Sequence, residues 1–365
     1  MRETPTVIIG AGLAGLAAAC TLQAAGHTPW IVEANERPGG RVETLHDEAG
    51  RAVADLGPNW VWPPFQPGIA RWLERLDVAV MEQFERGDAV LDGFSDTPVR
   101  QPLPGQHGMV RIAGGVGEIV RAMVARLPAE AIRQQAPVTE VALTDRSKLL
   151  VRIGNDETIL ADQVVMAAPL RLIAERIRLP RELPPALIET LSATPTWMAA
   201  QAKAVIRYER PFWRDHGLSG RIASRQGPLF EAHDHTSAAG DPALFGFIST
   251  PPGHRDPALL EKAIIHQLER CFGPAAREVS ALHIRDWADA RWICSAADRE
   301  GLPAHPTPGP EILRQGHLAD RLWFCAAETS TQSPGLIEGA LLAGERAGKA
   351  VLATMAAAHS GSDCA

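Results

Sequence analysis

The chain has 365 residues, of which 45% are hydrophobic, and its formal net charge is -7 at pH 7. This length suggests about two domains with a sizeable core, and the modest charge, spread without long runs of one sign, gives no signal for nucleic acid binding. Five cysteines, an odd number without CxxC spacing, predict reduced thiols in a cytoplasmic protein and no zinc ribbon.

Only six residues precede the first predicted strand, which leaves no room for the charged and apolar parts of a signal peptide, so we expect no export. The apolar segment 336–358 carries four charged residues, so it predicts a packed helix and no membrane span. Residues 359–365 are small and polar, and we expect a disordered tail.

A βαβ unit is predicted between Val7 and Glu33. Residues 7–9 are apolar and indicate a buried strand, 16–25 are mostly helix formers, and 29–32 form a second strand that ends on Glu33. Between the first strand and the helix lies GAGLAG, a GxGxxG pattern. In this context the pattern predicts a dinucleotide site, and a structural turn that binds nothing is the alternative.

Each glycine of this pattern has a physical role. Gly10 permits the tight turn, Gly12 lets the backbone approach a pyrophosphate, and Gly15 lets the helix pack closely on the strand. With Ala14 they are assigned to the cofactor site, where the helix N-terminus favours phosphates. Glu33 lies 18 residues beyond Gly15, where its carboxylate can accept hydrogen bonds from ribose hydroxyls.

A second glycine turn, RPGGRV at 37–42, brings backbone close to the same site, and Arg41 is a natural phosphate partner beside Gly40. GxGxxG, an acidic residue and then GGR together resemble the flavin-containing amine oxidase family (monoamine oxidase-like), here in a short form with a reduced substrate domain. The resemblance implies FAD as the cofactor and a small molecule as the substrate.

Two further segments match this family. DLGPNW at 55–60 is similar to the segment that lines the flavin, although Pro58 replaces a glycine and removes a possible backbone donor. The resemblance assigns Gly57, Asn59 and Trp60 to the cofactor site, while core packing is an equally good interpretation of Trp60. A meander of strands is predicted at 136–140, 148–153 and 163–168, and the resemblance implies that the backbone of Val138 contacts the adenine.

Lys203 lies on a predicted strand, 202–208, before an ERPFW turn that resembles the strand carrying the family's flavin-facing lysine. A lysine on a strand is more often an exposed edge charge, which is the alternative. If Lys203 is buried near flavin N5, its ammonium can hold a water and favour electron transfer to oxygen.

Glu231, His233 and His235 alternate along a possible strand, so they are candidate metal ligands. Histidines are spread through the chain and flavin oxidase chemistry needs no metal, so we predict a surface loop here and no metal site. A helix at 257–272 and a strand at 281–286 are expected in the substrate domain.

The closing stretch carries a second strong match. A strand at 322–325, Glu328, and a long helix that starts with Leu336 and Ile337 resemble the segment that in the family directs a helix N-terminus at flavin N1 and O2. Ala296 stands where some members carry a flavin-linking cysteine, so FAD is expected to be non-covalent. Ala297 and Leu336 replace the two aromatic residues that sandwich the amine in monoamine oxidases.

The resemblance implies an α/β chain: a doubly wound Rossmann-like FAD-binding domain with an inserted α+β substrate domain. The FAD-binding domain is assigned to 1–78, 109–170 and 287–358, and the substrate domain to 79–108 and 171–286. The segment 170–192 carries many prolines and is expected to cross from the first domain into the second.

The leading functional hypothesis is an FAD-dependent oxidase that removes hydride from a carbon-nitrogen bond of an amine and passes electrons to oxygen, giving hydrogen peroxide. An FAD-dependent dehydrogenase or desaturase that acts on a C-C or ring bond with another acceptor is the alternative, because the aromatic cage is missing. A third hypothesis is a flavin-binding protein without net redox chemistry.

Overall fold

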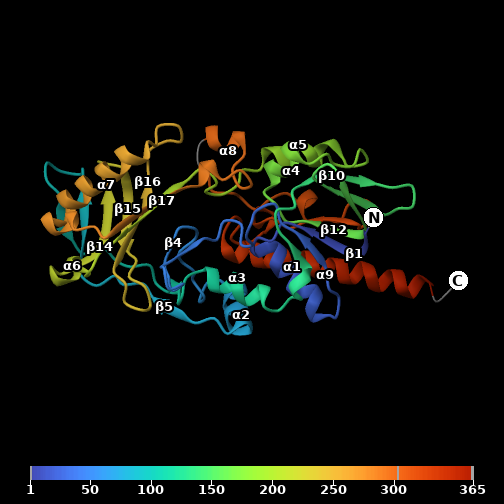
Figure 1. Cartoon of the computed structure of the whole chain (residues 1–365), viewed down its shortest axis with the longest axis horizontal. Coiled ribbons are helices and arrows are strands. Elements are labelled where there is room, and N and C mark those ends of the chain that lie inside the picture. The colour runs from blue at the N-terminus through green and yellow to red at the C-terminus, as the bar shows by residue number, and fades with distance from the viewer. Residues whose placement is uncertain (1, 302–303, 363–365) are drawn as a thin grey trace.

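The computed structural model describes residues 2–301 and 304–362, and Figure 1 shows two lobes with a sheet in each. The first sheet has strand order β10-β11-β12-β1-β2-β9, and β18 pairs in parallel with the last residues of β12. Its strands are β1 (Arg2–Ile9), β2 (Trp30–Val32), β9 (Ile132–Arg133), β10 (Val138–Leu143), β11 (Leu149–Ile153), β12 (Glu157–Met166) and β18 (Leu322–Phe324).

Helices cover both faces of this sheet (Figure 1). One face carries α1 (Leu13–Ala24), α2 (Pro67–Leu76), α3 (Gly117–Val124) and α9 (Ile337–Ser362). Small residues let α1 and α9 pack closely, since a Cβ at Gly344 would lie 2.2 Å from the carbonyl oxygen of Ala14. The central strands β1 and β12 run parallel, with Val7 opposite Val164 and both side chains fully buried. The predicted doubly wound Rossmann-like class is therefore confirmed.

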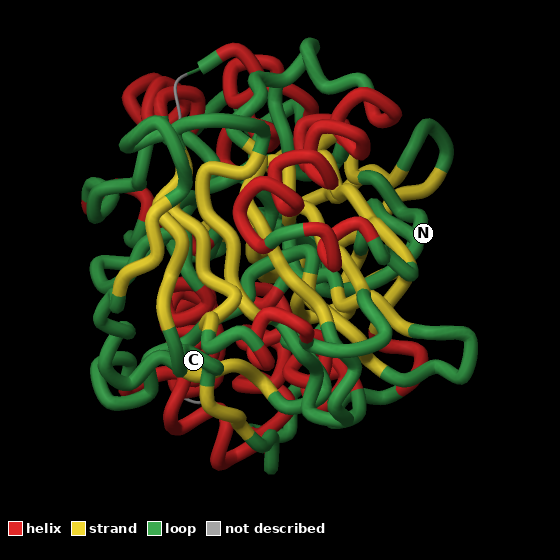
Figure 2. The backbone as a smooth tube through the Cα atoms, turned by 90° about the vertical axis from the view of Figure 1, so that its left-hand side faces the viewer, coloured by secondary structure: helices red, strands yellow, loops and turns green. Residues whose placement is uncertain are grey.

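The second sheet has strand order β17-β13-β16-β15-β14-β6-β7. Figure 2 views the molecule from the end at which this sheet lies. Apolar side chains on one of its faces pack against α6 (Phe212–Asp215) and α7 (Pro257–Phe272). The strands are β6 (Asp88–Asp92), β7 (Val99–Gln101), β13 (Ala202–Arg207), β14 (Leu218–Ser224), β15 (Leu229–Asp234), β16 (Ala243–Ile248) and β17 (Ala281–Asp286).

Two short antiparallel pairs lie between the lobes, β3 (Thr44–His46) with β4 (Ala52–Asp55) and β5 (Val80–Glu82) with β8 (Val110–Ile112). One further helix, α8 (Ala296–Glu300), follows β17. Single 3-10 turns complete the described elements: Ala129–Ala131, Pro274–Arg277, Trp287–Asp289, Glu311–Leu313 and Ala327–Thr329.

Several predicted bounds are confirmed, notably α7 and β17, which match residue for residue. The first strand is longer than predicted because β1 already pairs with β12 at Arg2, although its first residues are polar. Strand β12 begins at Glu157, six residues before the predicted start, because its first half pairs with β11 as well as with β1.

The predicted crossing into the substrate domain at 170–192 was wrong. This segment forms α4 (Leu170–Arg176) and α5 (Pro185–Ala193), whose apolar side chains pack on the first sheet. Proline at a helix N-terminus costs nothing, because the N–H that it lacks has no partner there. The prolines at 184 and 185 thus start a helix, and the chain crosses after it.

The end of the chain also differs from the prediction. Helix α9 continues through Ser362, so residues 359–362 are helical where a disordered tail was expected, and 363–365 lie outside the described residues. Within the described ranges, none of the helices combines the length and apolar character that a membrane span needs.

Candidate functional site

A cavity of about 630 Å³ lies between the two lobes. Its walls include residues that follow β1, β2, β12 and β18 and residues of β13, β15 and β16 on the second sheet. The carboxyl ends of the parallel strands in an open α/β sheet are the usual place for a ligand. All predicted site residues except Gly15 line this cavity: Gly10, Gly12, Ala14, Glu33, Gly40, Arg41, Gly57, Asn59, Trp60, Val138, Lys203, Glu328, Leu336 and Ile337.

The glycine turn has the geometry that its sequence requires. Gly10 has a positive φ of 107°, and a Cβ at Gly15 would lie 2.0 Å from its carbonyl oxygen, so only glycine fits beneath the turn. A Cβ at Gly12 would meet no protein atom within 4 Å, and Gly12 faces the cavity. Gly12 is also the N-cap residue of α1. Because Gly12 lines the cavity, the N-terminus of this helix lies at the cavity wall.

Glu33 is 5% exposed and lies where β2 ends. One carboxylate oxygen accepts the N–H of Ala11 at 2.7 Å and the other accepts the N–H of Asn35 at 2.8 Å. Each oxygen can accept a further hydrogen bond, and Glu33 lines the cavity. The carboxylate is therefore held rigidly beside the glycine turn, as a hydrogen-bond acceptor for a ligand.

Arg41 forms a two-pronged ion pair with Glu328, which is 1% exposed. Arg41 Nη1 lies 2.8 Å from Glu328 Oε1 and also donates to the carbonyl oxygen of Trp197 at 3.0 Å. This pair joins the GGR turn to the segment after β18, two predicted cofactor segments that lie 287 residues apart. Gly40 fits against the first glycine turn, because its Cβ position lies 3.4 Å from Gly12 Cα.

Lys203 is 4% exposed on β13, so the interpretation as an exposed edge charge was wrong. Its ammonium donates to the carbonyl oxygen of Gly57 and lies 5.5 Å from the ring centroid of Phe247. Burial lowers the pKa of Lys203 to about 7, although the charge of Asp55 acts in the opposite direction. Lys203 therefore changes charge near neutral pH inside the cavity.

Asp55 supports the segment that carries Gly57. Its carboxylate accepts hydrogen bonds from the Thr44 hydroxyl at 2.5 Å and from the Val116 N–H at 3.0 Å, at the start of α3. Burial raises the pKa of Asp55 to about 6, against the effect of these hydrogen bonds. The Asp55 N–H in turn donates to Nε2 of His235 at 3.0 Å.

Asn59 and Trp60 lie on the same segment. The Asn59 side chain is buried, and its Oδ1 has no hydrogen-bond partner in the protein although Asn59 lines the cavity. A buried acceptor without a partner costs free energy unless a ligand or water donates to it. Trp60 lines the cavity and also packs edge-on against Phe245 at 5.7 Å.

The prediction of a surface loop at Glu231, His233 and His235 was wrong. The first two lie on β15, and His233 Nε2 is 2.7 Å from Glu231 Oε1 at the cavity wall. His235 is fully buried on the Asp55 side, and burial lowers its pKa well below the usual value. In the described ranges we find no group of three or more His, Cys, Asp or Glu side chains placed to hold a metal ion.

Aromatic and apolar side chains of the second lobe were missed by the sequence reasoning. Phe230 and Phe247 stack at 5.6 Å between ring centroids, and both line the cavity. The alternation of Phe245 and Phe247 on β16 is a sequence signal for two rings on the same side of a strand, and Phe247 lines the cavity. Other cavity residues not singled out include Gln66, Met109, Trp197, Met198 and Trp292.

The residues present fit a flavin dinucleotide. The glycine turn, the open space at Gly12 and the start of α1 suit a pyrophosphate, while Glu33 suits a ribose. Asn59 Oδ1 provides a buried acceptor without a protein partner on a residue that lines the same cavity. Among the described residues that line the cavity none is a cysteine, and Cys294 is buried with its pKa raised to about 11.

Comparison with known proteins gives matches over most of the chain. The model of the family described as flavin containing amine oxidoreductase matches residues 84–352, and that of the NAD(P)-binding Rossmann-like domain matches 8–76. The probable flavin-containing monoamine oxidase A of Dictyostelium discoideum is 26% identical over 249 residues, which is 66% of this chain and 53% of that protein. The flavin-containing amine oxidase B of Bos taurus is 26% identical over 254 residues, 67% of this chain and 47% of that protein.

The chain thus spans about half the length of these curated relatives. Among solved structures, a putrescine oxidase bound to putrescine has a TM-score of 0.80 at 20% identity and covers 96% of this chain and 99% of its own. The cyclohexylamine oxidase from Brevibacterium oxydans IH-35A has a TM-score of 0.82 at 18% identity and covers 97% of this chain and 100% of its own. Because the first family model spans well over half of the sequence, the chain belongs to the flavin-containing amine oxidoreductase family.

Proposed function

We propose that the protein is an FAD-dependent oxidase that removes hydride from a carbon-nitrogen bond of an amine and gives hydrogen peroxide. The observation that carries this proposal is one cavity that joins the glycine turn of the first sheet to the buried Lys203 of the second. When bound, FAD would accept the hydride and deliver the electrons to oxygen. The chain supplies the binding groups, the apolar walls and a cation near neutral pH.

Non-covalent FAD binding rests on named groups in the first lobe. Gly12 and the start of α1 would meet the pyrophosphate, Glu33 the ribose, and the backbone at Val138 the adenine end. Ala296 is not among the cavity residues, and the nearby Cys294 thiol stays protonated because burial raises its pKa. Four free buried thiols among the described residues also support the proposed cytoplasmic location.

An amine substrate is supported by the walls of the second lobe. Phe230, Phe247 and Trp60 provide an apolar surface, and Glu231 is a carboxylate at the same wall. The similar solved structures carry the names putrescine oxidase and cyclohexylamine oxidase, and both names denote amines. Ala297 and Leu336 stand in place of the two aromatic residues of the amine cage, and Leu336 lines the cavity.

The decisive experiment is an anaerobic screen of amines, amino acids and polyamines with the purified protein, following flavin bleaching at about 450 nm. Bleaching by an amine, followed by peroxide formation when air is admitted, is the expected result. Protein that lacks flavin absorbance and gains none from added FAD would end the proposal. Bleaching without peroxide would point to an acceptor other than oxygen.

Glu33→Ala is expected to weaken FAD binding by about tenfold or more, because ribose hydroxyls lose their buried acceptor. Glu33→Ala also removes the acceptor of the Ala11 N–H. Glu33→Gln is therefore the control, because its side chain keeps one oxygen that can accept a hydrogen bond. Titration of the cofactor-free protein with FAD measures the effect. Wild-type affinity in Glu33→Ala would place the ribose elsewhere.

Arg41→Ala is also expected to weaken FAD binding, by about 1 to 3 kcal/mol. Part of this cost comes from Glu328, which stays buried without its two-pronged partner. Arg41→Lys keeps the charge but not the fork, so it should fall between Arg41→Ala and wild type in the same titration. Equal affinities in all three proteins would remove Arg41 from the cofactor site.

A further inference from the structure

Trp287 is a fully enclosed part of the cavity wall. Its side chain is 3% exposed, and its indole Nε1 donates to the carbonyl oxygen of Leu56 at 2.9 Å. Leu56 precedes Gly57, whose carbonyl oxygen accepts the Lys203 ammonium. The indole therefore holds the backbone segment that also positions Lys203.

The backbone at Trp287 leaves the second sheet by a 3-10 turn, Trp287–Asp289, at the end of β17. Asp286 caps this turn, because its Oδ1 accepts the Ala288 N–H at 2.9 Å. The Trp287 N–H donates to the carbonyl oxygen of Gln201 at 3.2 Å, just before β13. The backbone that carries the indole is thus held where the ends of β17 and β13 meet.

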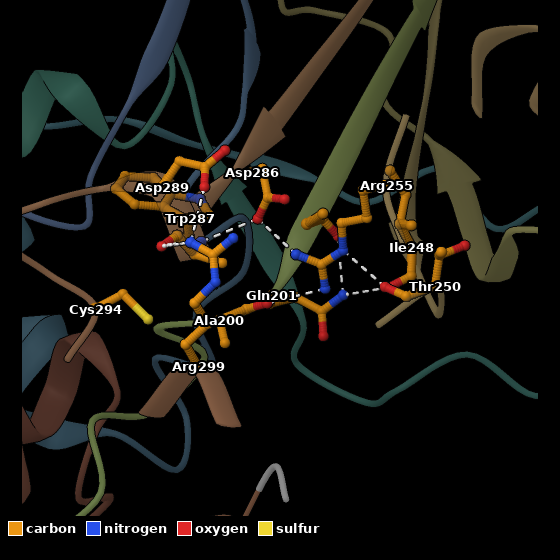
Figure 3. A network of polar contacts seen from close by, with 12 residues as sticks. Ala200, Gln201, Ile248, Thr250, Arg255, Asp286, Trp287, Asp289, Cys294 and Arg299 are labelled. Carbon is orange, nitrogen blue, oxygen red and sulfur yellow. Dashed lines mark hydrogen bonds and ion pairs between the residues drawn. The ribbon is translucent and has the colours of Figure 1, made fainter. Parts of the chain in front are cut away.

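Arg255 holds these ends, as Figure 3 shows. Its side chain is only 7% exposed, and Nη1 forms an ion pair with Asp286 Oδ1 at 2.5 Å. Nε donates to the carbonyl oxygen of Thr250 at 2.7 Å and Nη2 donates to that of Ala200 at 3.0 Å. One guanidinium therefore ties together the chain before β13, the chain after β16 and the end of β17.

Two neighbouring side chains extend this network (Figure 3). Gln201 Nε2 donates to the carbonyl oxygen of Ile248 at 2.7 Å, a second link between β13 and β16. Arg299 Nη1 lies 3.0 Å from Asp289 at the other end of the 3-10 turn. Arg255 itself does not line the cavity, so it can act on a ligand there only through the residues that it holds.

We propose that Arg255 and Asp286 are positioning residues that set the orientation of Trp287 in the cavity wall. The effect on a bound flavin rests on the proposed function, whereas the effect on the protein does not. A guanidinium suits this task because its planar fork makes several directed hydrogen bonds at once, which a lysine ammonium cannot reproduce. The competing explanation is that the pair stabilises the sheet without any specific effect on Trp287.

Hydrogen exchange of the protein without added flavin or substrate is the first test. In Arg255→Ala the amides of 286–290 are expected to exchange about tenfold faster, because Asp286, which caps the turn, loses its ion-pair partner. Asp286→Asn keeps an acceptor for the Ala288 N–H but loses the negative charge. Arg255→Lys keeps the positive charge but loses the planar guanidinium. In both variants the exchange rates of 286–290 should lie between those of the wild type and Arg255→Ala.

Arg270→Ala is the matched control. Arg270 makes two hydrogen bonds to the buried Asp92 in the same sheet, at 3.0 and 2.6 Å, and neither residue lines the cavity. This variant should be destabilised while exchange at 286–290 changes by less than about twofold. Unchanged exchange in Arg255→Ala, or an equal increase in Arg270→Ala, would overturn the proposal.

The visible circular dichroism of bound FAD is the second test. Arg255→Ala and Trp287→Phe are each expected to change this spectrum, and the double variant should match Trp287→Phe alone if Arg255 acts through the indole. Additive changes would show that Arg255 acts by another route. If the protein binds no flavin, the proposed function fails and the exchange experiment still decides the positioning role.

Discussion

Lys203→Met is expected to slow reoxidation of the reduced enzyme by oxygen about 10²-fold, the usual scale for one lost electrostatic stabiliser. The side chain keeps its length and loses the charge that would stabilise negative charge developing on oxygen. Reduction by an amine does not use this cation, so its rate should stay near wild type with FAD still bound. Rapid-mixing absorbance measures the two half-reactions separately.

The pH dependence gives an independent check on the same residue. Because burial lowers the pKa of Lys203 to about 7, its side chain is charged below that pH and neutral above it. Reoxidation by the wild-type enzyme should therefore become slower as the pH rises through about 7, and the Lys203→Met rate should not show this step.

Lys262→Met is the control for Lys203→Met, because Lys262 is exposed on α7 and does not line the cavity. It should behave as wild type in both half-reactions. Unchanged reoxidation in Lys203→Met would remove this lysine from the proposed mechanism and favour an acceptor other than oxygen.

Gly15→Ala is expected to destabilise the first lobe by at least about 1–3 kcal/mol, the usual cost of an extra methyl group in a packed interior. The added Cβ would lie 2.0 Å from the Gly10 carbonyl oxygen and 3.1 Å from Ala167 Cβ, so backbone must move. The movement opens the turn that faces the cavity, and FAD binding should be lost with stability. Chemical unfolding and FAD titration measure the two effects.

Gly12→Ala makes the opposite prediction and serves as the partner experiment. Its Cβ would meet no protein atom within 4 Å and its φ of -70° suits alanine, so stability should change by less than about 0.5 kcal/mol. The methyl group would occupy the space proposed for the pyrophosphate, so FAD affinity should fall. Wild-type FAD affinity in Gly12→Ala would place the pyrophosphate away from this turn.

The geometry of the glycine turn was predictable from the sequence because its determinants are local. The positive φ at Gly10 and the close packing at Gly15 follow from a strand, a tight turn and a helix within a few residues. Glu33 was placed by the length of that unit alone. Local signals also mark the bounds of α7, since Asp256 caps its start and Gly273 follows its last residue.

The proline-rich segment shows where local patterns mislead. The prolines of the segment 170–192 predicted a crossing between the domains, but proline suits the start of a helix as well as a connection. The choice depends on whether apolar residues find a surface to cover. Here Leu187 and Leu191 are fully buried against the first sheet, which no property of the segment itself could indicate.

By itself the sequence determined the Rossmann-like class, the dinucleotide turn and the family, because these depend on residues close together in the chain. Only the tertiary structure decided the burial and the pairing of charged groups that lie far apart in the chain. Lys203 is buried because Phe247 and Gly57 close over it from other segments, and Arg41 meets Glu328 across 287 residues. Burial and charge pairing depend on which surfaces meet in three dimensions, and the pKa of Lys203 changes only when they meet.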